Sequence, residues 1–187
     1  MKREVEVKFE LLDIENTIDK LDKMLGVSLP VFQHDSVYIK NLSNSVEEYL
    51  ANTEFPRIRI SENGALFSYK KNSNRGEDIQ DKLEIEFMVS DPLSCHNFLV
   101  EMGLNKQLEV KKTRRKYKYK DYELCVDSVE DLGNYIEIEK LLEHDDNSNF
   151  VDIEKELVDI IHGLDIEIGS KVSRGYDTLK LIKSLGI

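Results

Sequence analysis

Polar and apolar residues alternate in several short segments of the chain, as they do in β-strands that bury one face. In the opening run EVEVKFE, Glu4, Glu6 and Lys8 alternate with valine and phenylalanine. Successive side chains of a strand point to opposite faces, so this segment has one apolar and one charged face. An edge strand with a solvated outer face would have the same pattern. The interpretation therefore depends on whether the pattern recurs.

The alternation recurs in the runs QHDSVYIK, KLEIEFMV and NYIEIEK and in two predicted hairpins. The first hairpin lies in PRIRISENGALFSYKK, where Asn-Gly at residues 63–64 is typical of a type I′ turn. That turn would place Arg59 opposite Ser68 and Arg57 opposite Lys70, with the three basic side chains on one face. Because like charges this close are unfavourable, the cluster indicates a bound anion.

The second predicted hairpin lies in VKKTRRKYKYKDYELCVDSV and turns at residues 120–121. In the tightest register Arg114 faces Asp127, and Lys112 shares the face of Arg114. A basic strand interleaved with tyrosines is also found in nucleic-acid-binding proteins. The acidic net charge and the paired acids argue against that class.

Apolar residues at helical spacing predict helices that pack on the apolar face of the sheet. Asp13 and Asp91 are typical N-caps of the first two. The predicted helices cover residues 14–25, 92–102, 151–162 and 176–185. Polar segments predict connectors at residues 43–52, which include one helical turn, and at 72–82 and 144–149.

The chain has 187 residues, and we expect residues 1–187 to form a single domain. Its formal net charge of -11 does not favour binding to nucleic acid or to an anionic membrane. No segment has the roughly 18–20 apolar residues of a membrane span, and the N-terminus lacks a signal-peptide core, so we expect a cytoplasmic protein. Cys95 and Cys125 have no metal-binding spacing and are predicted to be reduced core thiols.

Antiparallel strands with an apolar outer face and a charged inner face predict a closed sheet around a water-filled tunnel. Isolated buried ions cost several kilocalories per mole each, so a charged interior implies water, mutual pairing and ligands. The alternative is a solvated ribbon in which the charges neutralise one another. The acids of this face are Glu4, Glu6, Glu84, Glu86, Asp127, Glu137 and Glu139, and its bases are Lys8, Arg57, Arg59, Lys70, Lys112 and Arg114.

The two kinds of charge suit different parts of one ligand. Carboxylates at alternate positions offer oxygen ligands for a hard divalent cation such as Mg²⁺ or Mn²⁺. Arginine and lysine offer hydrogen-bond donors to phosphate oxygens. The combination favours a metal-bound polyphosphate over a metal or an anion alone.

The run EVEVK resembles the E-x-E-x-K signature of the CYTH superfamily, the triphosphate tunnel metalloenzymes, which include class IV adenylyl cyclases and thiamine triphosphatases. QHDSVY, RIRI, FSYKK, LEIEF, KKTRRKY, a lone Asp127 and LGNYIEIE follow in order. The resemblance covers residues 4–140, with helices expected in 150–187. It implies an α+β fold, namely a closed antiparallel eight-stranded β-tunnel with a charged interior and flanking helices. It also implies a homodimer.

The resemblance implies roles by motif position. Glu84 and Glu86 would orient the basic residues or approach a second metal. Lys8 would also be the catalytic proton acceptor, provided that its pKa is depressed. The implied triphosphate contacts are Lys8, Arg57, Arg59, Lys70, Lys112 and Arg114. The implied ligands of Mg²⁺ or Mn²⁺, or residues beside them, are Glu4, Glu6, Asp127, Glu137 and Glu139.

Two reactions on a nucleoside or inorganic triphosphate fit such a site. In cyclisation the ribose 3′-oxygen attacks the α-phosphorus and pyrophosphate leaves, whereas in hydrolysis water attacks a terminal phosphorus. The chain length, DSVYI and LGNYIEIEK resemble the adenylate cyclase branch, which converts ATP to cyclic AMP and pyrophosphate. TEFPRIRI lacks the acidic-Ala-Leu lead-in often seen before the paired arginines, and SRGY replaces the Ser-Tyr found near the C-terminal end of many members of the superfamily. An inorganic or thiamine triphosphatase is therefore the alternative, and a non-catalytic polyphosphate-binding module is the third hypothesis.

Overall fold

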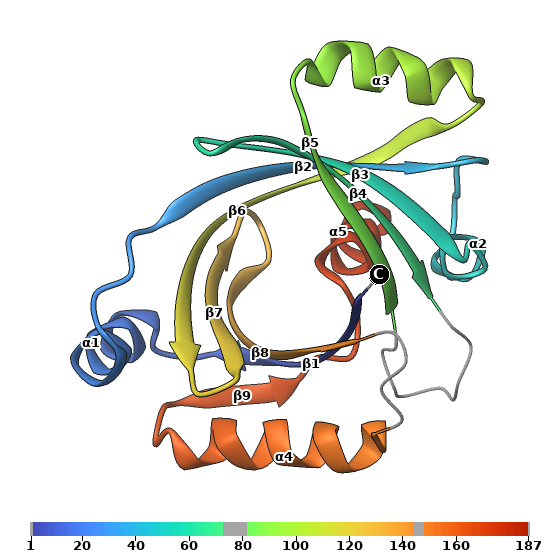
Figure 1. The fold of residues 1–187 in the computed structure, drawn as a ribbon. Coiled ribbons are helices and arrows are strands. Elements are labelled where there is room, and N and C mark those ends of the chain that lie inside the picture. The colour runs from blue at the N-terminus through green and yellow to red at the C-terminus, as the bar shows by residue number, and fades with distance from the viewer. Residues whose placement is uncertain (1, 73–81, 144–147, 187) are drawn as a thin grey trace.

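The computed structural model describes residues 2–72, 82–143 and 148–186, without the side chains of residues 2, 3, 72 and 82–84. Most of the predicted connectors 72–82 and 144–149 lies outside the described residues. Within them the chain forms a strongly curved sheet with helices around it (Figure 1). The strands are β1 (Lys2–Leu11), β2 (Val31–Ile39), β3 (Glu54–Ser61), β4 (Gly64–Asn72), β5 (Lys82–Val89), β6 (Asn105–Tyr119), β7 (Tyr122–Val129), β8 (Gly133–Glu143) and β9 (Ile168–Lys171). The helices are α1 (Ile14–Leu25), α2 (Val46–Leu50), α3 (Pro92–Glu101), α4 (Phe150–Gly163) and α5 (Tyr176–Leu185).

The sheet runs in the order β5-β4-β3-β2-β6-β7-β8-β1-β9, and its neighbours are antiparallel. β1 also pairs with β5, through residues 2–4 and 82–84. The α+β class, the antiparallel sheet and the flanking helices are confirmed. The closed eight-stranded tunnel is not confirmed, because the described chain has nine strands and β1 meets β5 along three residue pairs only. The ninth strand, β9, extends the sheet beyond β1 past a register shift.

The register of the β3–β4 hairpin differs by two residues from the prediction. Ser61 pairs with Gly64, and Arg57 therefore pairs with Ser68. A type I′ turn needs two residues with positive φ, but Gly64 has a φ of +109° whereas Asn63 is not among the positive-φ residues. Because a shift of two residues keeps every side chain on its face, the basic residues predicted to share a face still share it.

The β6–β7 hairpin has the predicted register. Arg114 pairs with Asp127, and Tyr119 pairs with Tyr122 across the turn. Lys120 occupies the turn with a φ of +55°. This register places Asp127 on the inner face beside the basic residues of β6.

The outer face of the sheet is covered by helices. α1 and α4 pack on β1, β6 and β8 in a core that includes Leu21, Ile136 and Leu157, all fully buried. α3 covers β2 and β3 through Leu99, which packs with Tyr38. The helices begin where the caps predict: for example, the Asp13 carboxylate accepts a hydrogen bond from the Asn16 backbone N–H. The apolar side chains of the alternating strands thus form the core beneath the helices.

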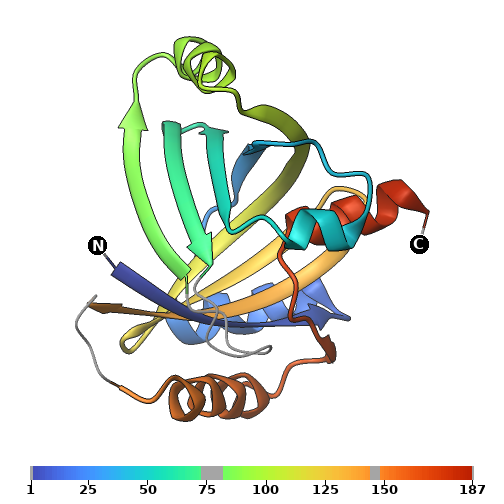
Figure 2. The same ribbon diagram turned by 90° about the vertical axis from the view of Figure 1, so that its right-hand side faces the viewer.

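The last helix lies at one end of the sheet beside α2 (Figure 2). Leu181 of α5 packs with Ile39 and Tyr49. Tyr176, the first residue of α5, packs on Tyr135 with 5.1 Å between the ring centroids. α5 therefore brings Tyr176 against the inner face of the strands.

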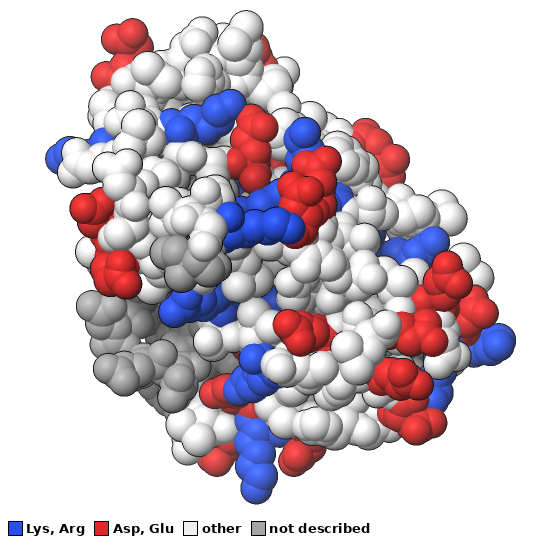
Figure 3. Space-filling model, turned by 180° about the vertical axis from the view of Figure 1, so that it is seen from behind, with Lys and Arg blue, Asp and Glu red and all other residues white. Residues whose placement is uncertain are grey.

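None of the helices in the described part of the chain is both long and apolar enough to cross a membrane. On the face that Figure 3 shows, acidic and basic side chains are interspersed, so neither sign of charge covers it. Cys125 is buried and Cys95 partly buried, and both are free thiols.

Candidate functional site

The inner face of the curved sheet carries charged side chains that are almost fully buried. They come from β1, β2, β6, β7 and β8, and each takes part in an ion pair. Buried ions are tolerated when they are paired and hydrogen-bonded. In the described residues the buried charged side chains are Glu4, Lys8, Asp35, Lys112, Arg114, Asp127 and Glu137.

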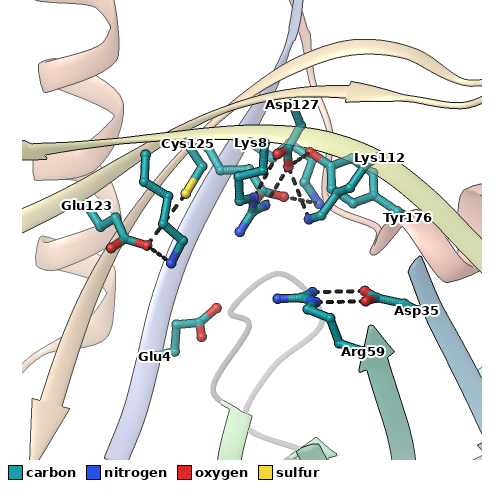
Figure 4. A network of polar contacts seen from close by, with 12 residues as sticks. Glu4, Lys8, Asp35, Arg59, Lys112, Glu123, Cys125, Asp127 and Tyr176 are labelled. Carbon is teal, nitrogen blue, oxygen red and sulfur yellow. Dashed lines mark hydrogen bonds and ion pairs between the residues drawn. The ribbon is translucent and has the colours of Figure 1, made fainter. Parts of the chain in front are cut away.

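Asp127 lies at the centre of a cluster of ion pairs. Its carboxylate accepts hydrogen bonds from Arg114 Nε at 2.7 Å, from Arg114 Nη2, from Lys112 Nζ at 3.2 Å and from the Tyr176 hydroxyl at 2.9 Å (Figure 4). Burial alone would raise the pKa of Asp127, but Lys112 and Arg114 outweigh it and hold the pKa below its usual range. Asp127 is therefore ionised and held by cations at neutral pH.

Glu137 links this cluster to β1. Lys8 Nζ lies 3.0 Å from Glu137 Oε1, and Arg114 Nη2 donates to the other carboxylate oxygen. Burial raises the pKa of Glu137, and Lys8 and Arg114 reverse the shift so that the pKa is lowered. Arg114 thus bridges two buried carboxylates.

The two lysines of this cluster have opposite pKa shifts. Burial lowers the pKa of Lys8, but Glu137 and Glu6 reverse that effect and leave it raised. Burial and the neighbouring Arg114 lower the pKa of Lys112 to about 8. Lys8 is therefore protonated at neutral pH in this arrangement, whereas a proton acceptor needs a depressed pKa, and its catalytic role stays a prediction.

A separate group of three carboxylates lies further along the inner face. One oxygen atom each from Glu4, Glu6 and Glu139 lies within 4.8 Å of the others. Burial, together with Glu6 and Glu139, raises the pKa of Glu4 well above its usual value despite Lys70, whose Nζ lies 3.7 Å away. Burial and the nearby acids raise the pKa of Glu139 to about 7. Three oxygen donors that repel one another fit a hard divalent cation, which would relieve the repulsion.

Asp35 of β2 holds the two arginines of β3. Arg59 donates from Nε and Nη2 to the two carboxylate oxygens at 2.7 and 2.8 Å, and Arg57 Nη1 lies 3.4 Å from Oδ2. Arg57 Nε also donates to Ser68 at 2.9 Å. Figure 4 shows the Arg59–Asp35 pair facing the space into which Glu4 also projects. Two strands that are distant in sequence thus direct cations and carboxylates into one space.

The chain matches the model of the CYTH domain over residues 2–176. The chain belongs to the CYTH family. A CYTH relative from Methanocaldococcus jannaschii, named "Putative adenylate cyclase", is 27% identical over 179 residues that cover 95% of this chain and 98% of the relative.

Two solved structures have the same CYTH fold over nearly the whole chain. A Pyrococcus horikoshii protein is 27% identical with a TM-score of 0.76, and the match covers 96% of this chain and 99% of that one. A Hippeastrum protein, described as a "putative adenylyl cyclase" with a dominant triphosphatase activity, has a TM-score of 0.62 at 13% identity, and the match covers 98% and 96%. At 13% identity the second likeness shows the fold alone.

The CYTH structure divides the predicted metal ligands between two places. Glu4, Glu6 and Glu139 form the three-carboxylate cluster, whereas Asp127 and Glu137 are engaged by lysine and arginine. The metal roles of all five stay predictions.

The predicted phosphate contacts and supporting acids lie at several places on the inner face. Lys70 is paired with Glu4, and Glu86 Oε1 lies 3.7 Å from Arg57 Nη2. The side chain of Glu84 lies outside the described residues. The remaining cations, Lys8, Lys112 and Arg114, lie in the Asp127 cluster.

Sequence reasoning missed two members of this CYTH site. Asp35 lies two residues from both Gln33 and Val37, so the strand period places the three side chains on one face. Nothing in the local sequence showed that this face is the inner one. Tyr176 begins a helix far along the chain; Lys8 Nζ lies 4.0 Å and Lys112 Nζ 4.8 Å from its ring centroid. The sequence feature that could have pointed to Tyr176 was the SRGY run, which ends at this residue.

We expect stabilisation of this CYTH protein by Mn²⁺ to rise between pH 6 and pH 8, with a midpoint near 7. The folded-state pKa of Glu139, about 7, exceeds its ordinary value of 4.5, so the stabilisation from this group is complete below pH 4.5 and is lost as pH rises to about 7. Metal binding needs the ionised carboxylate and offsets that loss. Thermal unfolding with and without Mn²⁺ across this range measures the effect, and a pH-independent Mn²⁺ shift would contradict it.

Proposed function

We propose that this CYTH protein catalyses divalent-metal-dependent phosphoryl chemistry on a triphosphate bound at the inner face, as an adenylate cyclase. One observation carries the proposal: the three-carboxylate cluster and the rows of buried cations lie on the same inner face. Glu4 belongs to the cluster and is at the same time 3.7 Å from Lys70. Metal and phosphate would therefore be held side by side.

The chain's own residues would supply most of the phosphate binding. Lys8, Lys112 and Arg114 of the Asp127 cluster, with Arg57 and Arg59 opposite, are proposed to contact the phosphate oxygens. Their fixed partners, Asp127, Glu137 and Asp35, hold these cations in place before the ligand arrives, which lowers the cost of ordering them. Glu4, Glu6 and Glu139 would hold Mg²⁺ or Mn²⁺, which supplies charge neutralisation at the phosphates.

In the proposed reaction the ribose 3′-oxygen attacks the α-phosphorus of ATP. The new P–O bond forms as the bond from the α-phosphorus to the bridging oxygen breaks, so cyclic AMP and pyrophosphate are the products, and the 3′-hydroxyl proton is released. The name of the Methanocaldococcus relative supports this reaction. The inner cations would stabilise the charge that develops on the leaving pyrophosphate.

Triphosphate hydrolysis is the second candidate. The dominant triphosphatase activity described for the Hippeastrum protein, which has this fold, is the observation that favours it. The same cations and carboxylates would then act on attack of water at a terminal phosphorus. The two candidates differ only in the nucleophile and in the phosphorus attacked.

The product spectrum decides between them. The protein is incubated with ATP, tripolyphosphate or thiamine triphosphate and Mg²⁺ or Mn²⁺, with a chelator-treated sample as control. We expect cyclic AMP and pyrophosphate in equal amounts from ATP. Release of inorganic phosphate without cyclic AMP would mean that the protein is a triphosphatase and not a cyclase. Tight metal-dependent binding without turnover would overturn both and leave a polyphosphate-binding module.

A further inference from the structure

Gln33 is a buried polar residue on the inner face whose side-chain carbonyl has no hydrogen-bond partner among the described residues. It is 7% exposed, and its Oε1 atom is buried and accepts no hydrogen bond from them. It precedes Asp35 by two residues in β2, so both side chains point to the inner face. Buried acceptors in folded proteins are nearly always satisfied, and an exception at a binding surface indicates a missing donor.

The surroundings of Gln33 place it beside the proposed phosphate contacts. In the sheet it pairs with Lys112 on β6 and with Ser61 on β3. Arg59 lies on the same face of β3, two residues from Ser61. If the phosphates of a ligand contact Lys112 and Arg59, the part of the ligand attached to those phosphates lies near Gln33.

Uncharged side chains also lie on this inner face. Two residues along β3 from Arg57, Arg59 pairs with Leu66, and Leu66 pairs in turn with Met88. Met88 is 63% exposed, and its Cε atom lies against the β3–β4 turn, 3.0 Å from the position of a Cβ built on Gly64. Leu66 and Met88 thus lie level with Asp35 and Arg59 across the sheet, and Gln33 and Ser61 lie two residues further along the same face.

We propose that Gln33 determines specificity by accepting a hydrogen bond from an N–H or O–H group on the uncharged organic part of the substrate. Leu66 and Met88 add apolar side chains to the same inner face. The substrate class is then a nucleoside triphosphate rather than inorganic tripolyphosphate, which has no such donor and no apolar surface. This inference rests on the proposed function, because it takes the cations beside Gln33 as phosphate contacts.

The test compares two ligands on two proteins. Dissociation constants of ATP and of tripolyphosphate are measured by titration calorimetry with Mn²⁺ at low temperature, with product formation followed in parallel, for the wild type and Gln33→Met. Methionine keeps the length of the side chain and removes the acceptor. We expect ATP to bind about tenfold more weakly to the variant, because a hydrogen bond is lost, and tripolyphosphate to bind within about twofold of the wild type.

Two controls separate specificity from folding. Thr113→Val, on the exposed outer face of β6, should change neither dissociation constant. The melting temperature of Gln33→Met should equal or exceed that of the wild type, since the exchange removes an unsatisfied buried carbonyl. Inosine triphosphate lacks the 6-amino group of ATP, and 2′-deoxy-ATP lacks the 2′-hydroxyl, so the two nucleotides identify the donor. The nucleotide without the donor to Gln33 should bind Gln33→Met as tightly as it binds the wild type.

Three results would overturn the inference while leaving the proposed function intact: an equal loss for ATP and tripolyphosphate, no loss for ATP, or a clearly lower melting temperature. The last would mean that the carbonyl has a structural partner. Failure of the wild type to bind either ligand in the presence of Mn²⁺ would instead overturn the proposed function itself.

Discussion

Replacement of Arg114 by methionine is expected to lower the free energy of unfolding by about 3–5 kcal/mol. Arg114 is 7% exposed and donates to Asp127 and Glu137 at once. Without it, two buried carboxylates lose their shared guanidinium: Glu137 keeps Lys8, and Asp127 keeps Lys112 and the Tyr176 hydroxyl. The loss is large because the charges left behind remain desolvated. Urea unfolding, followed by circular dichroism, measures it.

Lys111→Met is the matched control on the same strand. Lys111 points outward, and its Nζ lies 3.9 Å from an oxygen of Glu130, with both side chains well exposed. A surface pair of this kind contributes little, so we expect a loss below about 1 kcal/mol. If Arg114→Met cost no more than this control, the Asp127 cluster would not depend on Arg114, and our account of the inner face would be wrong.

Replacement of Glu6 by glutamine is expected to reduce metal-dependent turnover at least about a hundredfold while the fold is kept. Glu6 is one of three carboxylates whose oxygens lie within 4.8 Å of one another, and its charge raises the pKa of Glu4. The exchange removes a proposed metal ligand, and even residues around a metal typically contribute 10- to 100-fold. It also removes like-charge repulsion, so the melting temperature without metal should stay the same or rise.

The measurement for Glu6→Gln is the initial rate at saturating Mn²⁺ together with the Mn²⁺-induced shift in melting temperature. Both should fall. Glu101→Gln, an exposed carboxylate at the end of α3, is the control and should change neither. Wild-type turnover in Glu6→Gln would remove Glu6 from the metal site.

Face assignments could be predicted from the sequence because a strand has a period of two. Glu4 shares a face with Lys8, and Glu137 with Glu139, by this rule alone, and the short β6–β7 turn fixed Arg114 opposite Asp127. The β3–β4 register was wrong by two residues because Asn-Gly suits more than one kind of turn. A different type of turn here changed which residues pair across the two strands, but each side chain stayed on the same face of the sheet.

Contacts between distant segments could not be predicted in the same way. Asp35 meets Arg59 across 24 residues, and Tyr176 meets Asp127 across 49. Both depend on which strands become neighbours and where the last helix docks, and neither is encoded in a local pattern. The closure of the sheet likewise depends on strand tilt and stagger, on which alternation carries no information. The nine-stranded arrangement with β9 therefore emerged only from the structure.

One inner face is proposed to hold both the metal and the triphosphate. The most direct test is a crystal structure of the protein with Mn²⁺ and α,β-methylene-ATP, which cannot release pyrophosphate. We predict an anomalous manganese peak among the oxygens of Glu4, Glu6 and Glu139, with the phosphates against Arg57, Arg59 and Arg114. Manganese or phosphate bound elsewhere, with the ion pairs of Asp127 and Asp35 undisturbed, would contradict the claim.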